Sequence, residues 1–237
     1  MANKYFQFKQ FTIHQDHCAM KVCTDACLFG ALIANCELKT ANCLDIGTGT
    51  GLLSLMCAQK YPQATIDAVE IDPAATLQAK QNFEASNWKD RLNIINADIK
   101  DLGREKKYDL IISNPPFFEN DLQSGDTAKN AAKHDISLTL LDLLEIVAHR
   151  LTIDGSFAVL LPHPRVVYFE NEALLRGLYA TRKILVRQTP EHDLFRGILF
   201  FAKHPAPQVI TEMSIRRTDG GYTAEFIGLL KDYYLHL

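Results

Sequence analysis

The sequence predicts an α/β fold built on a largely parallel β-sheet, and two observations carry this prediction. Residues 43–53 form an apolar run that ends in an acid, followed by three glycines at alternate positions and then by leucines at helical spacing. This order is typical of a strand, a tight loop and a helix. Further along, short apolar runs alternate with helical patterns, which favours parallel strand pairing with right-handed crossovers.

The length of 237 residues suits one α/β domain with a small appendage. The net charge of −3 gives no overall positive field that would point to nucleic acid. No apolar run reaches the roughly 18 residues needed to cross a bilayer, and the N-terminus lacks the apolar core of a signal peptide. We therefore expect a cytoplasmic protein with no membrane-spanning segment.

The cysteines gather in the first quarter of the chain, where two histidines accompany them. Without a secretion signal, a disulfide framework is not expected. Some of these residues could form a zinc cluster, but their spacings match no paired cysteine motif, so buried reduced thiols are preferred and no metal is expected. The zinc candidates are His14, His17, Cys18, Cys23 and Cys27, and the remaining cysteines are Cys36, Cys43 and Cys57.

The N-terminal residues 5–13 alternate aromatic and polar side chains, which predicts a short strand or hairpin with one apolar side. Two interpretations stay open. The apolar side packs on the main domain, or the segment is an arm that faces RNA, since Lys4, Lys9 and Lys21 lie among the aromatic residues. A helix is predicted over 24–34, with Thr24 or Asp25 as its N-cap.

The glycines of the loop, Gly47, Gly49 and Gly51, allow positive φ and let a ligand approach the backbone closely. The following helix would direct free N–H groups and a partial positive charge into the same space, where an anionic group can bind. The spacing differs from the Gly-x-Gly-x-x-Gly pattern of dinucleotide-binding folds. A glycine-rich turn without a ligand is the alternative.

Acidic residues end the next two predicted strands. Glu70 closes the strand over 64–71, where an acid of a nucleotide-binding fold accepts hydrogen bonds from ribose hydroxyls; a merely solvated carboxylate is the alternative. Asp72 and Pro73 then start a helix that runs to about residue 87. Asp98 ends the strand over 92–98, either as an acceptor for an adenine amino group or as a cap.

The most specific motif follows a buried strand over 108–113 and reads Asn114-Pro115-Pro116-Phe117. Two prolines make this loop stiff. The side-chain oxygen of Asn114 and the carbonyl of Pro115 can each accept one N–H of an exocyclic amine, which steers the nitrogen lone pair and stabilises the developing charge. Phe117 offers a face on which the target ring can stack. A rigid turn with a buried phenylalanine is the alternative.

The remaining segments complete one domain, with no repeats and no low-complexity linker. A polar loop over 119–134 is expected beside the site. The predicted elements after it are an amphipathic helix over 135–151, a strand over 155–161, a helix near 165–178, strands near 181–188 and 196–203, and an aromatic helix in the tail from 222 to 237.

The glycine loop behind Asp45 resembles the first motif of S-adenosylmethionine-dependent methyltransferases. Together with the 114–117 motif it is similar to the amino methyltransferases that act on adenine, guanine or glutamine amides. Four stretches further resemble the family of tRNA1(Val) adenine-37 N6-methyltransferases. These are Phe8-Lys9-Gln10-Phe11, residues 18–22 with Thr24-Asp25, Ala68-Val69-Glu70-Ile71, and residues 110–117.

The resemblance implies a Rossmann-like class I methyltransferase fold. Its seven-stranded, mostly parallel sheet would have helices on both faces, with residues 1–35 as an N-terminal extension and residues 40–237 as the catalytic core. It implies S-adenosylmethionine as cofactor and, as substrate, the adenosine beside the anticodon of a valine tRNA, bound by a monomer. The implied cofactor-binding residues are Thr24, Asp45, Gly47, Gly49, Gly51, Glu70 and Asp98, and the implied catalytic residues are Asn114, Pro115, Pro116 and Phe117.

Many family members have tyrosine where this chain has Phe117, a change that keeps stacking but removes a hydroxyl hydrogen bond. Methylation of another amine (guanine N2 of rRNA, adenine N6 of DNA, or a protein glutamine) and a non-catalytic RNA-binding module are the alternatives. For a tRNA substrate, we expect the basic residues to cluster. The expected set is Lys4, Lys9, Lys21, Lys129, Lys133, Arg165, Arg216 and Arg217.

Overall fold

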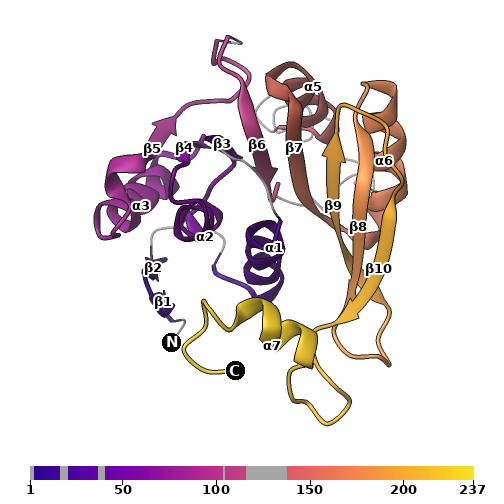
Figure 1. The fold of residues 1–237 in the computed structure, drawn as a ribbon. Coiled ribbons are helices and arrows are strands. Elements are labelled where there is room, and N and C mark those ends of the chain that lie inside the picture. Colours follow the sequence, from indigo (N-terminus) through magenta and orange to yellow (C-terminus); the bar gives the residue numbers. More distant parts are fainter. Residues whose placement is uncertain (1–2, 17–20, 37–40, 104, 116–137) are drawn as a thin grey trace, which may run out of the picture.

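A computed structural model of the chain describes residues 3–16, 21–36, 41–103, 105–115 and 138–237. Its centre is one eight-stranded sheet in the order β10-β8-β9-β7-β6-β3-β4-β5 (Figure 1). The strands are β3 (Asn42–Ile46), β4 (Thr65–Glu70), β5 (Leu92–Asn96), β6 (Tyr108–Ser113), β7 (Leu151–Pro162), β8 (Tyr179–Arg187), β9 (Leu194–Ala202) and β10 (Val209–Ser214).

The sheet is mostly parallel, as predicted. Strands β5, β4, β3, β6 and β7 run parallel to one another, and only β9 runs antiparallel, to β7 and to β8. The expected count of seven strands is wrong, because β10 adds a parallel eighth strand beside β8. This edge strand escapes sequence analysis because its first four residues are exposed and give no buried apolar run.

Helices cover both faces of the sheet, and each face has its own core cluster (Figure 1). Along β6, alternate residues serve the two clusters: Leu110 and Ile112 face one, and Ile111 faces the other. The first cluster includes side chains from α1 (Thr24–Ala34), α2 (Leu52–Lys60), α3 (Pro73–Glu84) and α7 (Ala224–Leu230), and the second includes side chains from α5 (Leu140–Arg150) and α6 (Val166–Leu175).

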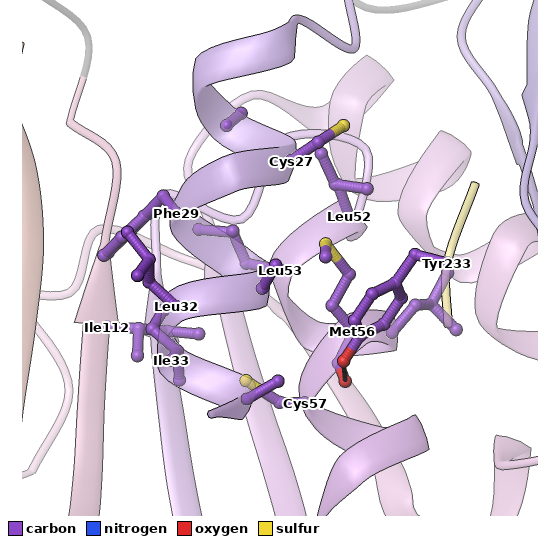
Figure 2. Close-up of a cluster of buried hydrophobic side chains, with 14 of the residues drawn as sticks. Cys27, Phe29, Leu32, Ile33, Leu52, Leu53, Met56, Cys57, Ile112 and Tyr233 are labelled. Atoms are coloured by element: carbon purple, nitrogen blue, oxygen red, sulfur yellow. Dashed lines mark hydrogen bonds between the residues drawn. The ribbon is translucent and has the colours of Figure 1, made fainter. Parts of the chain in front are cut away.

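Helices α1 and α2 pack closely through large apolar and sulfur-containing side chains (Figure 2). A Cβ atom at Gly30 would lie only 2.3 Å from the sulfur of Met56, so glycine permits this approach. The thiols of Cys27, Cys43 and Cys57 are buried here, as the sequence predicts, while Cys23 and Cys36 are half-buried. Burial raises the pKa of the Cys27 thiol to about 12.

The N-terminal residues form the predicted hairpin, made of β1 (Tyr5–Gln7) and antiparallel β2 (Thr12–His14). Phe8 and Phe11 stack with ring centroids 4.5 Å apart, and both are buried. The C-terminal segment joins them, because the N–H of Lys9 donates to the carbonyl of Tyr233 over 2.8 Å and Phe8 forms a β-bridge with Tyr234. The apolar side of the hairpin therefore packs on the main body.

Some helix starts follow local capping signals and others do not. Asp72 caps α3 through the N–H of Ala74, and Thr139 starts α5 with a capping box. The predicted cap of α1 is wrong: Cys23 is the N-cap, without a side-chain bond. The polar loop predicted over 119–134 lies outside the described residues. Among the described helices, none combines the length and apolarity required to traverse a bilayer.

Candidate functional site

Two neighbouring strands bring the glycine loop and the Asn-Pro motif to one edge of the sheet. Strands β3 and β6 are parallel, and their register pairs Ile46 with Ser113, the last residue of each strand. The hydroxyl of Ser113 donates to the carbonyl of Ile46 over 2.9 Å. Gly47 and Asn114 therefore begin adjacent loops at the carboxyl edge, which is where open α/β sheets bind ligands.

The three loop glycines all have positive φ, but they serve different ends. Their φ angles are 72° at Gly47, 57° at Gly49 and 84° at Gly51. A Cβ at Gly47 or Gly49 would meet no atom within 4 Å, so these two positions border open space. A Cβ at Gly51 would lie 2.4 Å from the ring of Phe83, so the third glycine permits packing of the loop on α3.

Asp45, at the end of β3, is fully buried and only half satisfied. Its Oδ2 accepts hydrogen bonds from the hydroxyls of Thr48 (2.6 Å) and Ser54 (2.7 Å). Its Oδ1 is buried and has no hydrogen-bond partner within the described chain. Burial raises the pKa of this carboxyl from 3.8 to about 6; the two hydroxyl bonds oppose the rise, and the charge of Glu70 adds to it.

Glu70 connects the second strand to the glycine loop. Its Oε2 accepts the N–H of Gly49 and its Oε1 accepts the N–H of Asp72, both over 2.9 Å. The alternative of a merely solvated carboxylate is therefore wrong. Glu70 is half-buried, and its carboxylate lies against the backbone of Gly49, which borders open space.

Asp98 and Thr24 form no hydrogen bond with the glycine loop among the described residues. Asp98 follows β5 and organises its own turn, with Oδ1 accepting the N–H of Lys100 over 2.9 Å. Thr24 is the first residue of α1 and half-buried. The adjacent Asp25 pairs with Arg196 over 2.8 Å, and Arg196 lies opposite Pro162 at the carboxyl end of β7. The start of α1 therefore reaches the same edge of the sheet.

Asn114 carries the second unsatisfied acceptor of this edge. The residue is half-buried, and its Oδ1 is buried without a hydrogen-bond partner in the part of the chain that the structure describes. Pro115, which follows, is buried. The two other residues of the predicted motif, Pro116 and Phe117, lie outside the described residues.

Sequence reasoning missed the side chains that support the glycine loop. Thr48 and Ser54 hold Asp45, and Ser54 could have been noticed as a lone polar residue in an apolar helical run. Buried Asn82 of α3 donates to the carbonyl of Thr50 over 2.9 Å and also bonds both backbone groups of His14. No local pattern marks Asn82, because its partners are distant in the chain.

The order and directions of the strands define a class I methyltransferase fold, and the comparisons agree. A predicted O-methyltransferase from Agrobacterium tumefaciens superposes with a TM-score of 0.66 at 16% identity, covering 88% of this chain and 96% of that chain. TrmN from Thermus thermophilus superposes with a TM-score of 0.54 at 20% identity, covering 76% of this chain and 48% of that chain. A family model described as the methyltransferase small domain matches residues 26–150.

Sequence relatives narrow this class to one family. A tRNA1(Val) (adenine(37)-N6)-methyltransferase from Trichodesmium erythraeum is 42% identical over 99% of both chains. A protein of the same name from Dyadobacter fermentans is 42% identical over 98% of both. The chain belongs to the tRNA1(Val) (adenine(37)-N6)-methyltransferase family, as the sequence motifs suggested.

The raised pKa of Asp45 predicts that the difference in unfolding free energy between the wild type and Asp45→Asn depends on pH. Between about pH 4 and pH 6 the folded wild type holds the proton of the Asp45 carboxyl more tightly than the unfolded chain does. The stabilisation of the folded state by this proton is therefore complete below about pH 4 and is lost as the pH rises to about 6. The unfolding free energy of the wild type minus that of Asp45→Asn should fall by roughly 3 kcal/mol across this range. Urea unfolding at several pH values measures it, and a constant difference would contradict the assignment.

Proposed function

We propose that this chain transfers a methyl group from S-adenosylmethionine to N6 of adenosine 37 in tRNA1(Val). Membership of the family carries the proposal, since relatives of that name are 38–42% identical over nearly the full length. The adjacent ends of β3 and β6 support it physically, because methyl transfer needs the donor and the acceptor amine within one site.

We assign cofactor binding to the carboxyl edge of β3 and β4. When bound, S-adenosylmethionine supplies an electrophilic methyl group on a sulfonium. Open space at Gly47 and Gly49 fits close approach of a ligand to the backbone. The free Oδ1 of Asp45 fits a ligand with a cationic donor, and Glu70 would accept hydrogen bonds from ribose hydroxyls. Thr24, Gly51 and Asp98 stay predictions as further members of this site.

Asn114 and Pro115 would hold the target amine. The lone pair of an exocyclic amine is delocalised into its ring, so the amine is a poor nucleophile. Acceptance of one N–H by Asn114 Oδ1 and of the other by the Pro115 carbonyl would turn the lone pair toward the methyl donor and stabilise the charge that develops. The unsatisfied Oδ1 supports this role. Stacking of the base on Phe117, with Pro116 stiffening the loop, stays a prediction.

The proposed reaction is tested by incubating the purified protein and labelled S-adenosylmethionine with total RNA, and in parallel with DNA and with protein, from cells that lack the enzyme. We expect N6-methyladenosine at position 37 of the valine isoacceptor, identified by mass spectrometry of nucleosides and of RNase fragments. Label in N2-methylguanosine, in DNA or in protein glutamine would contradict the proposed substrate. Cofactor binding without transfer to any of these would contradict catalysis.

Substitution of Gly47 should separate ligand contact from backbone strain. Gly177 also has a φ of 72° with open space around its Cα, but it follows α6, away from the glycine loop. Both Gly47→Ala and Gly177→Ala should lose about 1–2 kcal/mol of stability. Only Gly47→Ala should weaken S-adenosylmethionine binding, by roughly tenfold or more, a loss of ~1.4 kcal/mol. Isothermal titration measures this, and equal affinities for the two variants would argue against the site.

Substitution of Asn114 should affect the rate far more than cofactor affinity. Asn114→Ala removes an acceptor used in the transition state, so kcat should fall by roughly 10²–10³-fold. Asn114→Asp keeps an acceptor oxygen at this position and should retain more of the rate. Steady-state kinetics with the tRNA and calorimetry with S-adenosylmethionine test the two effects separately. A matching loss of cofactor affinity in Asn114→Ala would refute the role assigned to this side chain.

A further inference from the structure

We propose that the outward side of the N-terminal hairpin is an RNA-docking surface placed beside the cofactor loop. This surface comprises Lys4, Tyr5, Lys9 and His14 of the hairpin, with Lys21 beside it. The inference rests on the proposed function, because it takes the partner to be the tRNA. The sequence left open whether this segment packs on the main domain or faces RNA. Because the hairpin has one buried and one exposed side, it can do both.

The hairpin divides its side chains between two surfaces. Phe8, Phe11 and Ile13 are buried in the core, whereas the five residues of the docking surface are exposed. Tyr5 and His14 are cross-strand partners with ring centroids 6.2 Å apart. An exposed pair of rings among lysines suits single-stranded RNA, whose unpaired bases stack on aromatic side chains while its phosphates attract cations.

The lysines lie at both ends of the hairpin, with Lys4 and Lys21 at its open end and Lys9 in its turn, and they keep their charge available. Lys21 Nζ donates to the carbonyl of Asn3 over 3.4 Å, which places it next to Lys4. At the turn, Lys9 Nζ donates to the carbonyl of Lys231 over 2.5 Å, and the exposed side chain of Lys231 adds a further cation there. None of these four lysines forms an ion pair with a described residue. The described hairpin segment 3–16 contains one acid, Asp16.

A buried amide fixes this surface relative to the site. The backbone of His14 in β2 bonds the side chain of Asn82, and the same side chain bonds the carbonyl of Thr50 in the glycine loop. One residue therefore spans from the hairpin to the cofactor loop. RNA that presents a base to Asn114 must lie across this edge of the sheet, so the hairpin is within reach of the nucleotides that flank the target.

The test compares Lys4→Gln/Lys9→Gln/Lys21→Gln with Lys60→Gln/Lys80→Gln/Lys107→Gln, a control that removes three exposed lysines that are not part of this surface. Binding of a valine tRNA transcript is measured between 50 and 200 mM salt. For the hairpin variant, the slope of log K against log salt should become shallower by about 2, and the affinity at low salt should fall roughly tenfold or more. The control should bind like the wild type. Tyr5→Ala should weaken binding without changing the slope.

Three outcomes are decisive, with matching urea-unfolding midpoints establishing that each variant is folded. A shallower slope in the hairpin variant alone supports the surface. An unchanged slope in the hairpin variant, or an equal change in both triple variants, overturns the docking surface. In that case the proposed function still stands if the wild type methylates the transcript. Failure of the wild type to methylate any RNA overturns the proposed function and this surface with it.

Discussion

The parallel pairing of β3 with β6 is the constraint on which the site depends. Because the ladder pairs Ile46 with Ser113, the loops that follow leave the sheet side by side. A shift of this register by one residue would reverse the inward and outward faces of a strand that is buried on both sides. Core packing and loop placement are therefore fixed by the same contacts, and the Ser113 hydroxyl bond to Ile46 joins the two strand ends directly.

Two buried acceptors at this edge, Oδ1 of Asp45 and Oδ1 of Asn114, have no hydrogen-bond partner among the described residues. A buried polar atom left unsatisfied costs on the order of 1–3 kcal/mol, so native structures contain few of them. The fold tolerates this cost because Thr48 and Ser54 satisfy the other oxygen of Asp45 and the large apolar clusters stabilise the sheet. Donors brought by a ligand would remove the cost, which links stability at this edge to ligand binding.

The parts of the fold that local chemistry specifies were predictable from the sequence. The glycine loop, the Asp72 cap and the buried strand before Asn114 follow from glycine conformations, a capping side chain and an apolar run. The parts that depend on distant partners were not. The exposed strand β10 exists because β8 offers it an edge, Asp25 lies within α1 and pairs with the distant Arg196, and Asn82 joins segments 68 and 32 residues away.

The same distinction explains why the N-terminal hairpin depends on the rest of the chain. A two-stranded hairpin alone is marginally stable in water, and here β1 and β2 pair over only three residues each. Its stability comes from burial of Phe8 and Phe11 against Tyr234 and Trp88 and from the backbone bond of Lys9 to Tyr233. The two ends of the chain thus stabilise each other, and since Asn82 ties the hairpin to Thr50, disorder at either end would also loosen the glycine loop.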